Sequence, residues 1–314
     1  MRHWEAGDTE AVRRWRVGEV TITKVPESML EAGLAEPDPE NEGFLPYASC
    51  AELLQIDWLK PDFITDDGKI KLSFHALVVE TPTRRILVDT CVGNLKPRPL
   101  YPFWDQHKFP FLESLTAAGF VREDIDTVVC THLHVDHVGW NTMLVDGAWT
   151  PTFPNARYLF GRVEIERCEA AARAGDDGSA LHPTGFMSDS VQPIFEAGLA
   201  DLVEMDHRLC PEVTLCPTPG HTPGHVSVVI RSAGERALIT GDVIHHPSQI
   251  AHPEWSVSAD SDPAAAAETR ARLLADVADE GALVIGTHWA GRTAGVVARQ
   301  GPTYRLDPPG HRSA

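Results

Sequence analysis

A dense group of metal-binding residue types follows one short β-branched segment of the chain. Residues 125–131 form a short β-branched run typical of a buried strand. The next residues read Thr131-His132-Leu133-His134-Val135-Asp136-His137-Val138-Gly139. In an extended or tight-loop backbone His132 and His134 point to the same side, and Asp136 and His137 can turn toward a second point nearby. Imidazole and carboxylate together suit zinc or a similar divalent metal, so the pattern predicts a metal site at the end of a strand.

Three later segments offer further ligands where predicted strands end. The segment Thr218-Pro219-Gly220-His221-Thr222-Pro223-Gly224-His225 is a loop constrained by proline and glycine, with two histidines. Asp242 follows the predicted strand 237–240, and His288 follows the predicted strand 282–285. With one histidine of the loop counted, these segments and the first motif supply seven ligands, which is enough for two metals that share one carboxylate.

The remaining pattern predicts strands and helices in two halves of the chain. We expect strands at 17–25, 71–80, 85–89, 157–160, 213–216 and 226–230, and helices at 111–118, 162–174 and 262–280. This mixture favours a layered α/β fold. A single domain over 1–314 is expected, with an irregular insertion at 26–67 that contains one short helical stretch at 51–59. The insertion is predicted to be a lid, a dimerisation segment or a disordered surface loop.

Charge and composition exclude several classes of protein. The chain has 27 lysines and arginines against 45 aspartates and glutamates, a formal charge of −18. This balance argues against a nucleic-acid partner, whose binding depends on basic side chains. The first residues lack the apolar core of a signal peptide, and no apolar run is long enough to cross a membrane. The six cysteines form no CxxC pair. We therefore expect a cytoplasmic location with reduced thiols and no membrane partner.

The motifs and their order resemble the metallo-β-lactamase-fold hydrolases. The resemblance runs from about Lys71 to His288: an early aspartate after a strand (Asp89), the HxHxDH motif, a later histidine, a Gly-Asp pair and a final histidine. It implies an αββα sandwich in which two mixed β-sheets are flanked by helices, with the metals at the edge of the sheets.

The same resemblance implies a role for each candidate ligand. His132, His134 and His221 would hold one metal, while Asp136, His137 and His288 would hold the other. Asp242 would bridge the two ions. Asp89 would support the ligands without binding metal, and His225, the second histidine of its motif, would be structural.

Such a site supports hydrolysis by two metal ions, a hydroxide that they share and one carboxylate. Two divalent ions about 3.5–4 Å apart can hold a shared hydroxide at neutral pH. Zn²⁺ is the expected metal, with Fe, Mn or Co as alternatives. Asp136 is the expected catalytic residue that orients the nucleophile and accepts its proton.

Differences between this chain and other subfamilies of the metallo-β-lactamase-fold hydrolases narrow the range of expected substrates. Class B β-lactamases carry cysteine where this chain has Asp242, and flavodiiron proteins carry a carboxylate where it has His134. Glyoxalase II adds a long region after the last histidine, and ribonuclease Z relatives need a basic arm. The chain is therefore similar to the lactonase and methyl parathion hydrolase branch. The expected function is hydrolysis of a small lactone or carboxylic ester. The alternatives are organophosphate triester or aryl-ester hydrolysis at the same site, a ribonuclease Z-like nuclease, or a metal protein without catalysis.

Three residues near the motifs are candidates for substrate contact. Acyl-homoserine lactonases often have a tyrosine three residues after the bridging aspartate, and His245 stands there in this chain. We expect His245 either to donate a proton to the leaving group or to pack structurally. Trp140 and Trp289 are predicted to line the substrate pocket because each neighbours a ligand. The partner is expected to be a small molecule, with a homodimer possible.

Overall fold

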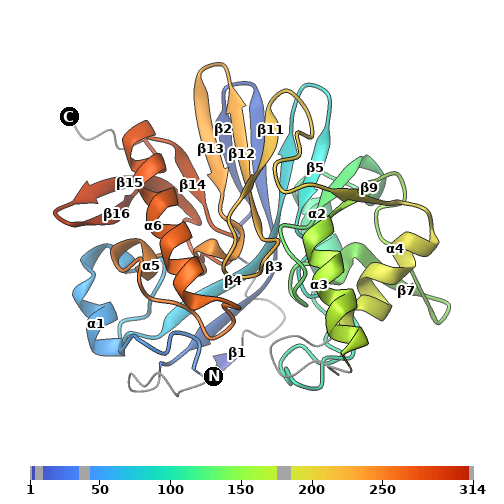
Figure 1. The fold of residues 1–314 in the computed structure, drawn as a ribbon, viewed down its shortest axis with the longest axis horizontal. Coiled ribbons are helices and arrows are strands. Elements are labelled where there is room, and N and C mark those ends of the chain that lie inside the picture. Colours follow the sequence, from blue (N-terminus) through green and yellow to red (C-terminus); the bar gives the residue numbers. More distant parts are fainter. Residues whose placement is uncertain (1, 4–9, 35–42, 175–184, 311–314) are drawn as a thin grey trace.

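Two mixed β-sheets lie face to face at the centre of the protein (Figure 1). The structure, a computed structural model, describes residues 2–3, 10–34, 43–174 and 185–310. The first sheet has the order β1-β3-β4-β5-β6-β9-β10, with β2 paired to β3. Its strands are β1 (Arg2–His3), β2 (Arg13–Val17), β3 (Val20–Ala32), β4 (Ile70–Glu80), β5 (Arg85–Val88), β6 (Thr127–Val129), β9 (Arg157–Gly161) and β10 (Ala200–Val203).

The second sheet has six strands in the order β11-β12-β13-β14-β15-β16. These are β11 (Val213–Pro217), β12 (Val226–Ser232), β13 (Glu235–Ile239), β14 (Leu283–Ile285), β15 (Ala294–Gln300) and β16 (Thr303–Asp307). A separate hairpin joins β7 (Thr142–Val145) to β8 (Ala148–Pro151) through Asp146 and Gly147. Both turn residues have positive φ, +48° and +82°, as a tight two-residue hairpin turn requires.

Helices cover the outer faces of both sheets. They are α1 (Cys50–Gln55), α2 (Phe111–Ala117), α3 (Arg162–Arg173), α4 (Gln192–Glu196), α5 (Ser248–Ala251) and α6 (Pro263–Glu280). In Figure 1, α6 lies beside the second sheet and α2 and α3 lie on the opposite side of the molecule. The predicted layered α/β arrangement, an αββα sandwich, is confirmed. Among the described residues, no helix combines the length and the apolar character that crossing a bilayer would need.

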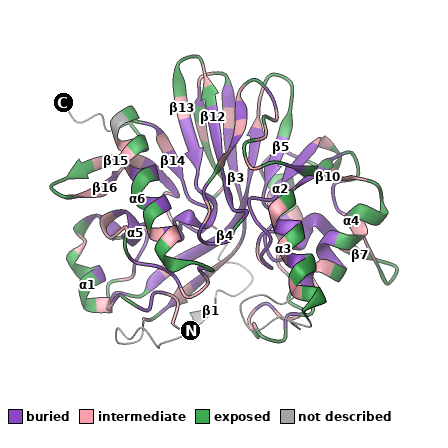
Figure 2. Ribbon diagram, in the orientation of Figure 1, coloured by how far each residue is buried: buried purple, intermediate pink, exposed green. Residues whose placement is uncertain are grey.

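The core between the sheets is built from strand residues of both. Ile22, Val79 and Val88 of the first sheet belong to the same buried cluster as Val228 and Ile239 of the second. Figure 2 shows the central strands as buried and the outward sides of the helices as exposed. Burying one side chain of this size contributes roughly 1.5–3 kcal/mol, so this layer of side chains holds the two sheets together.

The ends of α6, which was predicted at 262–280, follow from its sequence. The Asp262 side chain accepts a hydrogen bond from the amide of Ala265, and Pro263 occupies the first turn. Gly281 ends the helix in the left-handed conformation at φ +64°. These residues therefore fix where the helix begins and ends, and the chain enters β14 directly after it.

The predicted strand 17–25 is confirmed over 20–25, but its predicted start and the predicted irregular start of the 26–67 insertion were wrong. Val17 ends β2, and β3 continues to Ala32 in antiparallel pairing with β4. The register shifts between Pro26 and Ser28, which places a bulge at Glu27. A bulge leaves room for a proline in a strand and re-aims the neighbouring side chain. The short helical stretch at 51–59 is confirmed as α1 and a 3-10 turn, residues 35–42 lie outside the described residues, and the single-domain expectation stays a prediction.

Candidate metal centre

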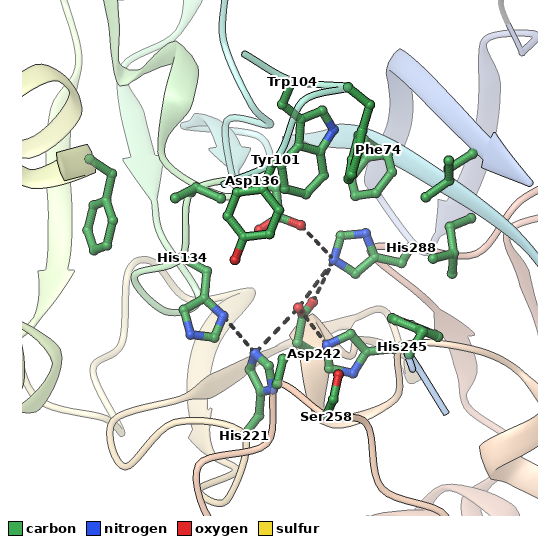
Figure 3. A pocket seen from close by; sticks show the side chains of 17 residues that line it. Phe74, Tyr101, Trp104, His134, Asp136, His221, Asp242, His245, Ser258 and His288 are labelled. Carbon is green, nitrogen blue, oxygen red and sulfur yellow. Dashed lines mark hydrogen bonds and ion pairs between the residues drawn. The ribbon is translucent and has the colours of Figure 1, made fainter. Parts of the chain in front are cut away.

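The predicted ligands all lie in loops that follow strands at one edge of the sandwich. Asp89 follows β5, and the HxHxDH motif follows β6. His221 lies between β11 and β12, Asp242 lies just after β13, and His288 lies just after β14. Because these strand ends meet at the same edge, residues far apart in the sequence converge on one point (Figure 3).

His132, His134 and His221 form the first group. Nδ1 of His134 lies 3.0 Å from Nε2 of His132 and 3.0 Å from Nε2 of His221. Zinc–nitrogen bonds of about 2.0–2.1 Å in a tetrahedral site place neighbouring ligand atoms roughly 3.3 Å apart. The three imidazoles therefore present their nitrogens at the spacing that one metal ion requires.

Asp136, His137 and His288 form the second group. Nε2 of His137 lies 3.1 Å from Nε2 of His288, and Oδ2 of Asp136 lies 3.8 Å and 3.6 Å from these two nitrogens. Oδ2 of Asp242 lies 3.1 Å from Nε2 of His137 and 3.6 Å from Nε2 of His221. Asp242 thus faces both groups, and the donor set of five imidazoles and two carboxylates fits a pair of divalent ions.

Two carboxylates orient the ligands from outside the centre. Nδ1 of His137 lies 2.8 Å from Oδ2 of Asp89, and Nδ1 of His221 lies 3.0 Å from Oδ1 of Asp260. A carboxylate at Nδ1 fixes the tautomer, so that the Nε2 lone pair of each ring faces the centre. Asp89 is held in turn by the amide of Thr131 at 2.7 Å. Asp89 has the supporting position that the resemblance implies.

Three positioning residues were missed by the sequence analysis. Asp260 carries no motif, and it lies far along the chain from His221. Thr287 donates a hydrogen bond from Oγ1 to Oδ1 of Asp242 at 3.0 Å. Buried Glu164 of α3 accepts hydrogen bonds from the amides of Leu133 and Gly224 at 3.0 and 2.9 Å, which ties the two histidine loops together. Of the three, only Thr287 could have been found from the sequence, because it directly precedes the predicted ligand His288.

Burial and charge set the protonation of the centre. Burial and the neighbouring His137 hold the pKa of His132 well below its ordinary value. Burial opposes the charge of His137, but Asp242 and Asp89 outweigh it and hold its pKa well above the ordinary value. Burial would raise the pKa of Asp242, but His137 and His288 outweigh it and hold that pKa well below the usual range. Asp242 therefore stays ionised, as a bridging ligand must.

The two remaining histidines of the motif region differ in their surroundings. His225 accepts a hydrogen bond at Nε2 from the amide of Asp242 at 2.8 Å, and its Nδ1 lies 3.0 Å from the carbonyl of Thr218. Both of its ring nitrogens contact backbone groups of neighbouring residues, which fits the predicted structural role. His245 instead lines the cavity, with Nε2 at 3.0 Å from Oδ2 of Asp242. Its Nδ1 has no hydrogen-bond partner among the described residues.

An apolar cavity opens above the centre (Figure 3). The cavity has a volume of about 200 Å³. Its floor contains side chains of the metal centre, and its walls are Leu30, Phe44, Leu72, Phe74, Tyr101, Phe103, Trp104, Val135, Phe186, Ser258 and Ala259. No lysine or arginine is among the described residues that line it. Pockets with such an apolar lining favour uncharged, largely apolar groups.

The prediction that Trp140 and Trp289 line this cavity was wrong. The indole of Trp140 donates to Oε1 of Glu27 at 2.7 Å and stacks on a core phenylalanine. Trp289 is fully buried and donates to the carbonyl of Ile244 at 3.0 Å. Trp289, although next to His288 in the chain, therefore packs in the core and not against the cavity that His288 lines.

Comparisons with known proteins agree with this geometry. The family model described as the metallo-beta-lactamase superfamily matches residues 75–288. An N-acyl homoserine lactonase of Bacillus thuringiensis is 30% identical over 118 residues, which are 38% of this chain and 38% of that protein. An N-acyl homoserine lactonase of Bacillus cereus is 29% identical over 181 residues, 54% of this chain and 62% of that protein. The alignment thus spans less than two thirds of the length of these relatives.

Solved structures match over nearly the whole chain. AidC, a dizinc quorum-quenching lactonase in complex with a product, superposes with a TM-score of 0.75 at 24% identity. The hydrolase AbOPH of the beta-lactamase superfamily superposes with a TM-score of 0.75 at 23% identity. Each match covers 96% of this chain and 98% of the other. At these identities the likeness supports a shared fold.

Proposed function

The chain belongs to the metallo-β-lactamase superfamily, and within it we propose that it is a dinuclear metal-dependent hydrolase of small lactones or carboxylic esters. The observation that carries the proposal is the convergence of five histidines and two aspartates on one point, where five of them line an apolar cavity: His134, Asp136, His221, Asp242 and His288. The lactonase relatives support the choice of a lactone. Zn²⁺ is the proposed metal because imidazole and carboxylate ligands suit it, and a structural neighbour is a dizinc enzyme.

The proposed ligands divide into two sets that share one carboxylate. His132, His134 and His221 would hold one ion, while Asp136, His137 and His288 would hold the other, with Asp242 between them. Two ions in such a site activate water at neutral pH and polarise the carbonyl oxygen of an ester. The chain's own part is to fix these ligands through Asp89 and Asp260 and to exclude bulk water with the apolar walls.

Asp136 and His245 are the proposed catalytic side chains. Asp136 lines the cavity and is 15% exposed, so its carboxylate can accept the hydrogen bond that orients the attacking water. His245 lines the cavity near Ser258, and its ring is the proposed donor to the oxygen of a leaving group. Its Nδ1 is buried and makes no hydrogen bond within the described part of the chain. A leaving alkoxide needs such a donor more than a stabilised phenolate does, because the alkoxide is the stronger base.

A second candidate function uses the same centre on organophosphate triesters or aryl esters. The aromatic rings of Phe74, Tyr101, Phe103 and Trp104 in the cavity wall favour it, because aromatic groups pack well against one another. A nuclease is disfavoured, since no lysine or arginine lines the described cavity to bind a phosphate chain. The cytoplasmic location, the homodimer and a lid role for residues 26–67 stay predictions.

The test compares three substrate classes on protein whose metal content has been measured. N-hexanoyl homoserine lactone, 4-nitrophenyl esters and a dialkyl aryl phosphate are assayed side by side. We expect the lactone to be turned over fastest, and His132→Ala to abolish the activity. His245→Phe places another aromatic ring beside Phe44 and removes the ring nitrogens, and it should reduce lactone turnover far more than aryl-ester turnover. Absence of any hydrolysis by the metal-loaded protein would refute the proposed function.

A further inference from the structure

A closed loop carries three aromatic side chains into the cavity wall. Residues 95–107, here called the aromatic loop, begin and end side by side. The amide of Leu95 donates to the carbonyl of His107 at 2.9 Å, and the amide of Gln106 donates to the carbonyl of Lys96 at 2.8 Å. Loops whose ends meet in this way are compact units. Tyr101, Phe103 and Trp104, which line the cavity, all lie on this loop. Figure 3 shows Tyr101 and Trp104 at the cavity.

A buried ionic cluster joins the base of the aromatic loop to a distant part of the chain. The Nη1 and Nη2 atoms of Arg98 donate to Oδ2 and Oδ1 of Asp189 at 2.7 and 2.9 Å. Nζ of Lys96 donates to the carbonyl of Asp189 at 2.7 Å and to Oγ1 of Thr142 at 2.5 Å, and it lies over the ring of Trp149. Lys96 and Asp189 are at most 3% exposed. Buried charges are retained only when they are paired this fully.

Asp189 also anchors a second part of the cavity wall. It lies in the π-helical turn Met187–Val191, which follows directly on Phe186. Phe186 lines the cavity together with the aromatic loop. The two walls come from segments about 90 positions apart in the chain, and the Arg98–Asp189 pair joins them directly. π-helical turns are frequent at functional sites.

We propose that the Arg98–Asp189 pair, with Lys96, positions the aromatic loop and Phe186 and thereby determines which apolar groups the cavity accepts. These residues touch neither the metal ligands nor the cavity, so they are positioning residues rather than catalytic ones. The two-pronged contact fixes both the distance and the direction between the segments. The inference rests on the proposed function in one respect, namely that the cavity holds the apolar part of the substrate.

The test removes one charge and keeps the size of the side chain. Asp189→Asn is made in the metal-loaded enzyme, and Asp201→Asn serves as the matched control, because Arg157 and Asp201 form a similar two-pronged pair that is exposed. For Asp189→Asn we expect KM for a decanoyl lactone or naphthyl ester to rise about tenfold, the equivalent of losing the burial of about two methylene groups. Butanoyl-lactone kinetics, kcat and metal content should stay unchanged. The control should match the wild type throughout.

Two further measurements keep the inference separate from the proposed function and from a folding defect. Amide hydrogen exchange should accelerate in residues 95–107 of Asp189→Asn and stay unchanged in residues 132–137. The neutral probe N-phenyl-1-naphthylamine should bind the variant more weakly even if no ester is hydrolysed by the wild type. If Asp189→Asn does not fold, Arg98→Lys keeps the charge, loses the two-pronged contact and undergoes the same assays. Unchanged exchange and probe binding, or an equal loss of kcat on every substrate, would overturn the inference.

Discussion

The closest backbone approach beside the metal centre lies between Gly139 and the loop after β5. A Cβ atom at Gly139 would meet the carbonyl oxygen of Val92 at 1.8 Å and the amide nitrogen of Gly93 at 2.5 Å. Both are backbone atoms, so no side-chain rotation can relieve the contact. Relief requires the two segments to move from 1.8 Å to an ordinary contact of at least 3.4 Å, a separation of about 1.6 Å. Metal sites tolerate displacements of about 0.2 Å in their ligand distances.

This movement would separate a ligand from its supporting carboxylate. The amide of Thr90 donates to the carbonyl of His137, and the amide of Gly139 donates to the carbonyl of Cys91, both at 2.8 Å. Asp89, which contacts Nδ1 of His137, belongs to the same loop. Gly139→Ala is therefore expected to lose the metal held by Asp136, His137 and His288 and to keep the metal of the first group. Overpacking should also lower the free energy of unfolding by about 3 kcal/mol.

The assay is the number of metal ions per chain, measured by elemental analysis after gel filtration, together with urea unfolding. Gly33→Ala is the control, because a Cβ at Gly33 meets no atom within 4 Å. We expect two ions per chain for the wild type and Gly33→Ala, and one ion for Gly139→Ala. Two ions at wild-type affinity in Gly139→Ala would refute the reasoning.

Two further predictions concern a supporting carboxylate and a buried lysine. Asp260→Asn weakens the hydrogen bond at Nδ1 of His221, so metal affinity measured by chelator competition should fall roughly 10- to 100-fold, and an unchanged affinity would contradict this role. Burial lowers the pKa of Lys96 to about 7 from its ordinary 10.5. The unfolded chain therefore binds this proton below about pH 10.5 and the folded chain only below about pH 7. The unfolding free energy of the wild type relative to Lys96→Met, measured by urea unfolding, should fall as pH drops from about 10.5 to 7 and then level off. If the unfolding free energies of the two proteins instead change in parallel with pH, Lys96 is not desolvated.

Local signals predicted most of the strands and all seven proposed ligands. The ends of α6 were readable because Asp262, Pro263 and Gly281 act on their own neighbours in the chain. The ligands were readable because each lies in a motif next to a strand, and strand ends of one edge meet in space.

What the sequence could not supply depends on contacts between distant segments. β3 continues past Pro26 because β4 pairs with it on both sides of the bulge at Glu27, and no local signal marks that pairing. Asp260 and Glu164 act on loops that are far from them in sequence. The cavity tryptophan was misplaced for the same reason: Trp104 reaches the cavity through the closure of residues 95–107, whereas Trp289, next to a ligand, points into the core.

The most direct test of the central claim is a crystal structure of the zinc-loaded protein with anomalous diffraction measured at the zinc edge. The proposed centre predicts two anomalous peaks about 3.5–4 Å apart, on either side of the Asp242 carboxylate. One peak should lie among His132, His134 and His221, and the other among Asp136, His137 and His288. A single peak, or two peaks that Asp242 does not join, would contradict the claim that these seven residues form one dinuclear centre.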